Sequence, residues 1–370
     1  MNTRFADYSN SLVNLTCSVQ KHFGIEPGHN TLPAVDALLQ QYNHRNVVFM
    51  LFDGMGANLL GRIMGDDCFF SRHKVGEMSS VLPSTTTAAT TTVISGLTPY
   101  EHGWVGWDVY FKEVDKIVTL YPNTVKDTRI PAADYHVAKR YAPYKDMMHQ
   151  VSEVQGARGE GIQPFGEGIV YSDKDDMFRY IREVCEEDGR HFIYAYSDEP
   201  DATFHREGTE SARAKAYLAH VNEMTEQLCA ALTDTLVIVF ADHGHVNVKP
   251  MFLSDYPELA ALLERGPSVE PRCCSFKVRA GSEARFERLF KKHFGKHFTL
   301  FSAAEVLEKQ LFGDGETPAP NFRAAIGDYI AVAVSDRFIL KDRTLHVHKS
   351  THAGITDDEM LVPLILINCK

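Results

Sequence analysis

Aspartate, histidine and threonine residues that can bind metal ions lie far apart along this chain. Aspartate oxygens and imidazole nitrogens are common ligands of Zn²⁺ and related ions, and a threonine hydroxyl becomes a nucleophile once its proton is removed. Two metal ions about 4 Å apart promote in-line displacement at phosphorus. We therefore expect hydrolysis of a phosphate ester or anhydride at a site made of seven residues: Asp53, Thr86, Asp201, His205, Asp242, His243 and His352.

A threonine-rich stretch at residues 83–92 contains six threonines and one serine. This composition suits neither a helix nor a loop by propensity, and the structural alternatives are a β-strand or a hydroxyl-rich helix start. If a helix begins after Pro83, its free N–H groups and its dipole would stabilise a phosphate near one of these hydroxyls. Composition alone does not select the threonine.

Two pairs of possible metal ligands have informative spacing. Asp201 and His205 are four residues apart at the start of an expected helix, so both side chains can face one ion. Asp242 and His243 are adjacent at an expected strand end, where ligands need a tight turn that Gly244 can supply. The second pair is the more informative, because an isolated D-x-x-x-H pattern is common.

The remaining histidines near these pairs have weaker signals. His245 is interpreted as a structural histidine or as a residue that supports a ligand. His346 and His348 are interpreted as alternating surface histidines on a strand. His352 lies nine positions before the last apolar run, which predicts a loop that enters the final strand.

Short apolar runs predict the strands that position these residues. They are residues 46–52, 192–197, 236–241 and 361–367, and the first three end just before or near Asp53, Asp201 and Asp242. Helices are expected at 57–64 and 209–233. This alternation predicts an α/β fold, with a mostly parallel central sheet and helices on both faces. Ligands of such sheets bind beyond the carboxyl ends of the strands, so the aspartates should share one edge. Pro363 in the last run predicts an irregular or edge strand.

The pattern changes between residues 250 and 345. Strands are expected at 273–278 and 329–334, and helices at 282–293 and 302–311. We predict a small α+β insertion that borders the active site, with residues 1–249 and 346–370 forming the metal-binding core. Residues 99–170 show no clear periodicity.

Composition excludes some classes of protein. The formal net charge is −11 and no run rich in Lys or Arg occurs, which argues against binding of a nucleic-acid polymer. No signal-peptide core and no membrane-spanning run is present, so we expect a cytoplasmic protein without a membrane partner. The cysteine count is odd, with no C-x-x-C pair, which favours reduced thiols; the seven are Cys17, Cys68, Cys185, Cys229, Cys273, Cys274 and Cys369. The sequence does not predict the oligomeric state.

The order of the motifs resembles the alkaline phosphatase superfamily, and most closely its type I phosphodiesterase/nucleotide pyrophosphatase branch. The matching segments are Phe52-Asp53-Gly54, the threonine run with Ser95-Gly96 and Thr98-Pro99 through His102-Gly103, Asp201 with His205, Asp242-His243-Gly244, and His352-Ala353-Gly354. The nucleophile of these branches lies ten residues before the glycine that corresponds to Gly96, which implies Thr86. The absence of cysteine in 83–92 argues against the sulfatase branch.

The resemblance also implies how two metals, normally zinc, are held. Asp201, His205 and His352 would bind one ion. Asp53, Thr86, Asp242 and His243 would bind the other. Thr86 would form a covalent phosphothreonine or nucleotidyl-threonine intermediate that water then hydrolyses.

One departure from the family pattern concerns the substrate. Trp107 stands where the branch usually has an asparagine that binds a phosphoryl oxygen. Its indole N–H can donate one hydrogen bond, or its ring can stack on the substrate, whereas Trp104 is interpreted as a packing residue. No arginine that would clamp a dianionic phosphate is recognised.

The leading hypothesis is therefore a two-metal hydrolase of a small substrate that contains a phosphodiester or pyrophosphate, with nucleotides among the candidates. The alternatives are a phosphomonoesterase or phosphonate hydrolase of the same superfamily, and a non-catalytic metal-binding module. The presence of all seven ligand-type residues argues against the non-catalytic module.

Overall fold

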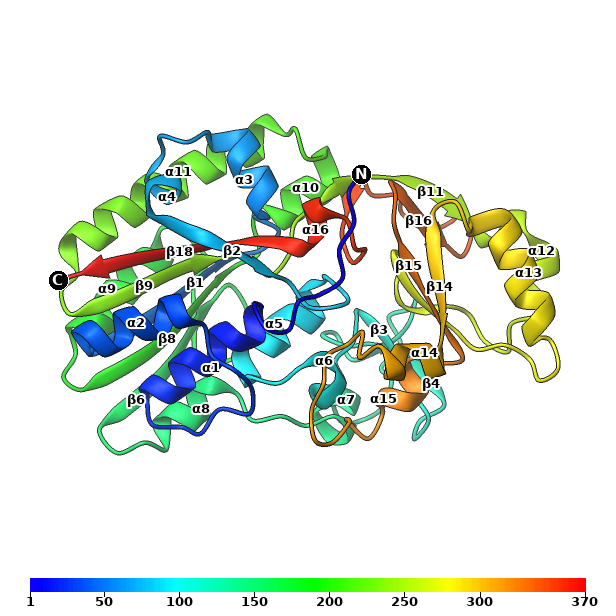
Figure 1. Cartoon of the computed structure of the whole chain (residues 1–370), viewed down its shortest axis with the longest axis horizontal. Helices are drawn as coiled ribbons and strands as arrows, with labels where there is room; N and C mark the ends of the chain where they lie inside the picture. The colour runs from blue at the N-terminus through cyan, green and yellow to red at the C-terminus, as the bar shows by residue number, and fades with distance from the viewer.

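The computed structural model describes residues 1–370, and two seven-stranded sheets lie at opposite ends of the molecule (Figure 1). We call the first the central sheet. Its strands, in spatial order, are β2 (Lys74–Ser79), β18 (Leu361–Cys369), β9 (Thr235–Phe240), β1 (Asn46–Phe52), β8 (Arg190–Ser197), β6 (Ala157–Gln163) and β7 (Ile169–Val170).

The central sheet is mixed rather than uniformly parallel. Strands β9, β1, β8, β6 and β7 run parallel to one another, whereas β18 is antiparallel to both β9 and β2. The chain reaches β18 from α16 (Asp357–Met360), close to His352 at the edge where the parallel strands end, so it must run back through the sheet. Strand β18 lies inside the sheet, which corrects the edge alternative predicted from Pro363, but its pairing does shift register between Leu364 and Ile365.

Apolar runs predicted the strands that are buried on both faces. All seven residues of β1 are buried, and its bounds match the predicted run 46–52. Strand β6 was missed because its sequence, ARGEGIQ, contains two glycines and little apolar surface. Gly159 is needed there because a Cβ would lie 2.4 Å from Met148 Cα.

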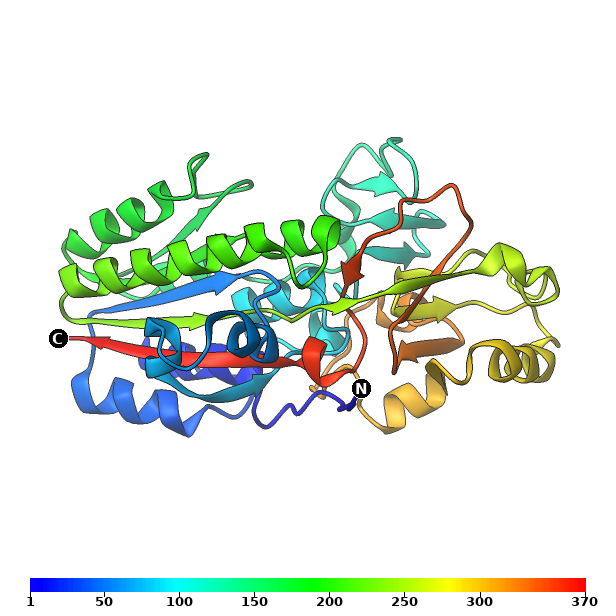
Figure 2. The ribbon, with the colours of Figure 1, turned by 90° about the horizontal axis from the view of Figure 1, so that it is seen from above.

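Helices cover both faces of the central sheet, as predicted. One group contains α1 (Leu12–His22), α2 (Pro33–Tyr42), α5 (Thr86–Ser95) and α8 (Met147–Ser152), and the other contains α3 (Ala57–Met64), α4 (Phe69–His73), α9 (Asp176–Glu186) and α11 (Ala212–Ala231) (Figures 1 and 2). A core of 52 buried apolar residues joins the layers. Helices α3 and α11 correspond to the predicted helices at 57–64 and 209–233.

The second sheet is antiparallel throughout. Its strands, in spatial order, are β14 (Phe298–Ser302), β15 (Tyr329–Ala333), β13 (Cys273–Phe276), β12 (Ser268–Glu270), β3 (Asp108–Phe111), β4 (Lys116–Thr119) and β5 (Thr124–Val125). Four of them come from residues 250–345, together with α13 (Glu283–Phe294) and α14 (Ala303–Glu308). The other three come from the segment 99–170, which showed no periodicity.

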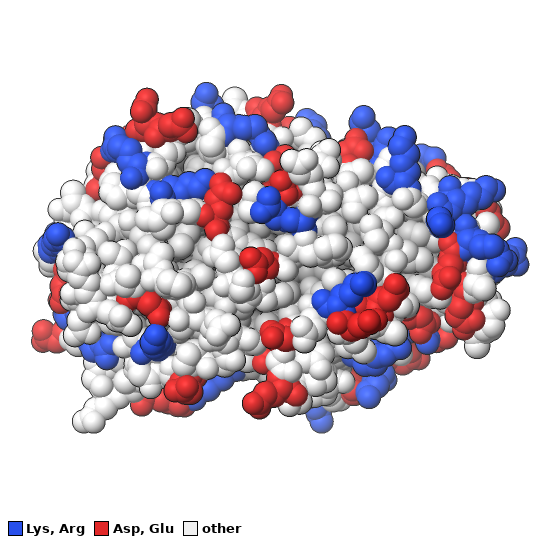
Figure 3. Space-filling model, in the orientation of Figure 1, with Lys and Arg blue, Asp and Glu red and all other residues white.

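The elements not yet named are short and lie outside the two seven-stranded sheets. They are α6 (Pro99–His102), α7 (Val137–Tyr141), α10 (Asp201–Glu207), β10 (Val246–Asn247), β11 (Lys249–Phe252), η1 (Leu253–Asp255), α12 (Pro257–Ala260), α15 (Phe322–Ala325), β16 (Arg337–Leu340) and β17 (Ser350–Thr351). None of the helices combines the length and apolar character needed to cross a bilayer. On the face drawn in Figure 3, basic and acidic side chains are interspersed, with basic side chains most frequent at the end that carries α12 and α13.

Candidate active site

The seven predicted residues come together at the carboxyl edge of the central sheet. Asp53 directly follows β1, the pair Asp242-His243 follows β9, and Asp201 begins α10 shortly after β8. Thr86 is the first residue of α5, and His352 directly follows β17. Two groups of ligand-type atoms result, and both contain Asp201. One also contains three histidines, and the other also contains Asp53 and His243.

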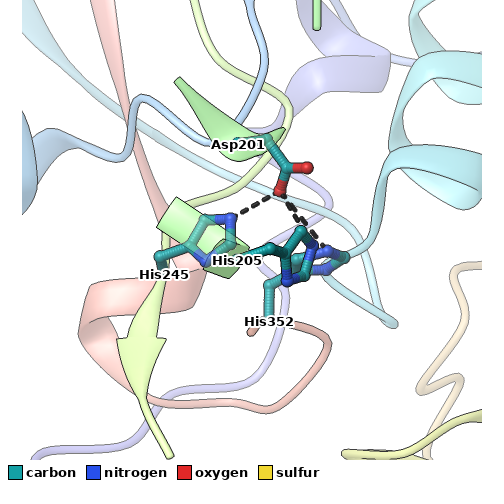
Figure 4. Close-up of side chains that lie close together, drawn as sticks. All are labelled: Asp201, His205, His245 and His352. Carbon is teal, nitrogen blue, oxygen red and sulfur yellow. Dashed lines mark hydrogen bonds and ion pairs between the residues drawn. The ribbon is translucent and has the colours of Figure 1, made fainter. Parts of the chain in front are cut away.

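Three imidazoles surround the carboxylate of Asp201 (Figure 4). Its Oδ1 lies 3.3 Å from Nε2 of His205, 3.6 Å from Nε2 of His352 and 2.5 Å from Nε2 of His245. The four ligand atoms all lie within 4.8 Å of one another. His205 and His352 were predicted here, whereas His245 was set aside as structural or supporting.

Hydrogen bonds determine which ring nitrogen carries the proton in His205 and His352. Nδ1 of His205 lies 2.9 Å from the Ser350 carbonyl oxygen, and Nδ1 of His352 lies 3.1 Å from the Ser84 carbonyl oxygen. A carbonyl oxygen only accepts, so both Nδ1 atoms must donate. In the neutral rings, Nε2 is then unprotonated and its lone pair faces Asp201, as in metal-ligating histidines.

His245 has the same orientation. The Ser350 hydroxyl donates its only proton to the Phe204 carbonyl oxygen at 2.7 Å, so it can only accept from His245 Nδ1, at 3.1 Å. Burial lowers the pKa of His245 to about 4, which makes the ring neutral at pH 7. Nε2 of His245 therefore faces a carboxylate oxygen at 2.5 Å, an arrangement that a shared proton or a metal ion would stabilise.

The second group joins four predicted residues. Nε2 of His243 lies 3.4 Å from Asp53 Oδ1, 3.3 Å from Asp242 Oδ2 and 3.1 Å from Thr86 Oγ1. Its Nδ1 lies 3.1 Å from the Gly244 carbonyl oxygen, so Nδ1 donates a hydrogen bond and the neutral tautomer of this ring has its lone pair on Nε2. Imidazole, carboxylate and hydroxyl atoms, all of them possible metal ligands, thus converge at one point.

Two carboxylates of this group lack the partners that buried charges need. Asp242 Oδ1 accepts N–H bonds from Gly54 and His243, but Oδ2 is buried without any hydrogen-bond donor. Burial and the neighbouring Asp242 and Asp201 carboxylates raise the pKa of Asp53 well above its usual value. Tyr196, missed from the sequence, donates to Asp53 Oδ2 at 2.6 Å. Divalent cations fit such a donor set because they supply the missing positive charge.

Thr86 combines this ligand group with a helix N-terminus. Residues 86–95 form α5, and its first backbone bond runs from the Ala89 N–H to the Thr85 carbonyl. No side chain caps the preceding N–H groups, so they are free to bind an anion. The hydroxyl-rich helix start proposed for residues 83–92 is therefore the observed alternative.

Residues 47–352 match the family described as type I phosphodiesterase/nucleotide pyrophosphatase. The chain belongs to this family. The predicted resemblance is thereby confirmed, and with it the enzyme class, a metal-dependent hydrolase of phosphoric esters.

Solved structures share the fold of this chain. Murine ectonucleotide pyrophosphatase/phosphodiesterase 5 is 16% identical, with a TM-score of 0.66 over 86% of this chain and 87% of that chain. An inactive variant of the murine protein in complex with AMP has a TM-score of 0.65, also at 16% identity, with coverage of 86% and 87%. The human protein has a TM-score of 0.65 at 14% identity, with 87% of each chain covered. A search of curated proteins found no match.

Trp107 stands at the position of the family's usual asparagine. Together with Tyr121 it forms an aromatic rim beside α5. Its side chain is 43% exposed, and its ring meets Tyr121 edge-on at 5.5 Å. Tyr121 bonds to the Thr90 hydroxyl at 3.1 Å, and Thr90 donates to the Thr86 carbonyl oxygen. Trp104 is buried and donates its indole N–H to the Ala142 carbonyl oxygen, which agrees with a packing role.

The histidines before β17 differ from the prediction. Residues 341–349 form no strand, so His346 and His348 do not alternate on one. His346 is exposed, but the His348 ring lies against His205 with 4.4 Å between ring centroids. His348 Nδ1 is buried without a hydrogen-bond partner.

Lysine and arginine side chains do not bond to the predicted site residues. No Lys or Arg side chain forms a hydrogen bond or ion pair with any of the seven predicted residues. Arg272, the largest fully buried side chain of the second sheet region, forms an ion pair with Glu359. A monoester dianion would therefore find no bidentate clamp beside Thr86.

Proposed function

We propose that this chain hydrolyses a phosphodiester or pyrophosphate bond through a covalent intermediate on Thr86, with two zinc or similar ions. The observation that carries the proposal is the convergence of the Nε2 atom of His243 with Asp53, Asp242 and Thr86 at the free N-terminus of α5. A non-catalytic metal module would not need a nucleophilic hydroxyl at that point.

The residues present suit both metal positions. Asp201, His205 and His352 would hold one ion, and Asp53, Asp242, His243 and Thr86 the other. Such ions, when bound, supply Lewis-acid stabilisation of phosphoryl oxygens and favour the ionised form of the Thr86 hydroxyl. The carbonyl partners of His205, His243 and His352 keep each ring in the tautomer that offers Nε2.

The covalent route follows from the position of Thr86. Its Oγ1 would form a bond to phosphorus while the bond from phosphorus to the leaving oxygen breaks. The N–H groups at the start of α5 would bind a phosphoryl oxygen, because they have no capping side chain. Water would then cleave the Oγ1–P bond, which releases the phosphate product and restores the hydroxyl.

A diester suits the electrostatics better than a monoester. The site contains several carboxylates and no bonded Lys or Arg, and a diester carries one negative charge less than a monoester dianion. The exposed ring of Trp107 adds apolar surface where a substituent of the substrate can lie. The murine relative was solved with AMP, which makes nucleotide esters a sensible part of the substrate screen.

Kinetics on paired substrates tests the proposal. After purification with zinc we expect about two metal equivalents per chain, and a higher kcat/KM for bis-p-nitrophenyl phosphate than for p-nitrophenyl phosphate. Trp107→Asn should shift the ratio of the two values and leave the metal content unchanged. A clear preference for the monoester would overturn the diesterase proposal, and the absence of bound metal together with failed reconstitution would overturn the two-metal proposal.

A further inference from the structure

Glu270 reaches from the second sheet to the start of α5. It is the last residue of β12 and is buried, and its Oε1 accepts two hydrogen bonds of 2.7 Å. One comes from the hydroxyl of Thr85, the residue before Thr86, and the other from the backbone N–H of Trp107. The carboxylate therefore bridges the residue next to the proposed nucleophile and the residue on the aromatic rim.

The backbone around Glu270 is strained to hold this position. Val269 has φ +75°, a conformation that is a genuine outlier for a β-branched residue. Gly106 packs directly on it, because a Cβ at Gly106 would lie 2.8 Å from both the carbonyl oxygen and Cγ1 of Val269. Strain of this kind costs free energy and persists where the surrounding structure requires a particular side-chain placement.

The surroundings of Glu270 do not neutralise it fully. Its Oε2 has no hydrogen-bond partner, whereas Oε1 has two. The nearby titratable groups are Asp108, Lys126, His205, Cys273 and Cys274. Among these groups only Lys126 is a permanently charged cation at neutral pH. Its Nζ lies 3.3 Å from Asp108 Oδ2 and donates to the Pro267 carbonyl oxygen. Burial raises the pKa of Glu270 to about 7, so the carboxyl is largely ionised at pH 8.

We propose that Glu270 determines substrate charge: its carboxylate, held beside the Thr85–Thr86 turn, disfavours dianionic phosphate groups relative to monoanionic ones. This inference rests on the proposed function and extends it to the substrate class. Like charges in a buried site repel far more strongly than in water, and a phosphate bound at the start of α5 would lie on the same turn as the Thr85 hydroxyl. The reaction itself does not require Glu270.

Two variants separate the charge of Glu270 from its hydrogen bonds. Glu270→Gln keeps an oxygen that can accept from Thr85 and Trp107 but removes the charge. Thr85→Val removes one of the hydrogen bonds and leaves the charge. At pH 8 we expect Glu270→Gln to raise the monoester-to-diester ratio of kcat/KM about tenfold and to tighten competitive inhibition by inorganic phosphate about tenfold. Thr85→Val should lower kcat/KM for both esters by a common factor.

A third variant tests the sign of the effect with Glu270 intact. Lys126→Met removes the neighbouring cation, so it should lower the monoester-to-diester ratio and weaken phosphate inhibition. The inference is overturned if Glu270→Gln changes both esters by the same factor and leaves phosphate inhibition unchanged, because Glu270 would then only position α5. If the wild-type chain cleaves neither ester, the proposed function fails, and calorimetric binding of inorganic phosphate to the same variants still decides the role of the charge.

Discussion

The three threonines around the start of α5 have different surroundings. Thr85 donates to Glu270, and the Thr87 hydroxyl is buried without a hydrogen-bond partner. Only Thr86 is half-buried at the site, where its Oγ1 lies 3.1 Å from His243 Nε2 and 3.5 Å from Asp53 Oδ1. These contacts select the same residue as the ten-residue spacing to Gly96, although the role of Thr86 as nucleophile stays a prediction.

Replacement of the hydroxyl tests this role. We expect Thr86→Ala to lower kcat/KM for the diester by at least about a thousandfold, because loss of a nucleophile removes the covalent route. The melting temperature and metal content should change little, since two carboxylates and an imidazole remain. The matched control is Thr87→Ala, which removes a hydroxyl that bonds to nothing and should retain most of the activity. Near-normal turnover by Thr86→Ala beside an inactive Thr87→Ala would reverse the assignment.

The turn after β9 is the element that depends most on close backbone approach. The Gly244 N–H donates to the Glu359 carbonyl oxygen at 2.9 Å, and a Cβ at Gly244 would lie 2.0 Å from the Asp358 carbonyl oxygen. The turn and α16 therefore pack backbone to backbone. This contact sets the position of Asp242 and His243, which directly precede the glycine.

A methyl group at position 244 should push the turn after β9 and helix α16 apart. We expect Gly244→Ala to lower the free energy of unfolding by about 1–3 kcal/mol, the usual cost of overpacking, and to lower the metal content. The control is Gly61→Ala in α3, where a Cβ meets nothing within 4 Å and alanine should stabilise the helix by about 0.5–1 kcal/mol. Urea unfolding and elemental analysis of both variants measure these effects. Unchanged metal binding in Gly244→Ala would show that the turn tolerates the shift.

Across the whole molecule, a buried ion pair links the second sheet to the metal-site loops. Arg272, between β12 and β13, donates twice to Glu359 of α16, at 2.6 Å each, and both side chains are fully buried. Glu359 also accepts from the Gly354 N–H at 2.7 Å, two residues after His352. The two ends of the molecule therefore jointly position the loop that carries His352.

The metal ions should also govern how the stability of the whole fold depends on pH. Burial raises the pKa of both Asp53 and Asp242 in the metal-free protein. A raised folded-state pKa means that the folded chain holds more protons than the unfolded one, so stability falls as pH rises from about 4, the unfolded value, through the raised value. Bound cations replace those protons. We therefore expect chelation to reduce the free energy of unfolding more at pH 8 than at pH 5.5.

Urea unfolding at both pH values, with and without prior chelation, measures this difference. The control variant is Asp53→Asn, which removes the carboxyl with the strongly raised pKa and should weaken the pH dependence of the metal-free protein. An equal loss of stability on chelation at the two pH values would contradict the expected coupling.

Local patterns in the sequence were sufficient for the strands that precede the predicted aspartates. Burial on both faces requires a continuous apolar run, so the bounds of β1 and the position of Asp53 after it could be read directly from residues 46–52. Helix α3 matches its predicted range for a similar reason, because its apolar positions repeat with helical spacing. The order of the motifs then identified the family.

Features that depend on contacts between distant segments were not predictable. The direction of β18 depends on the edge from which the chain enters the sheet, and the strands β3–β5 join the second sheet only through the pairing of β3 with β12. His245 meets Asp201 across 44 positions, and Glu270 meets Thr85 across 185. Neither pair leaves a local pattern, because propensity and periodicity describe neighbours along the chain, whereas the packing of the two sheets determines which of the distant side chains meet.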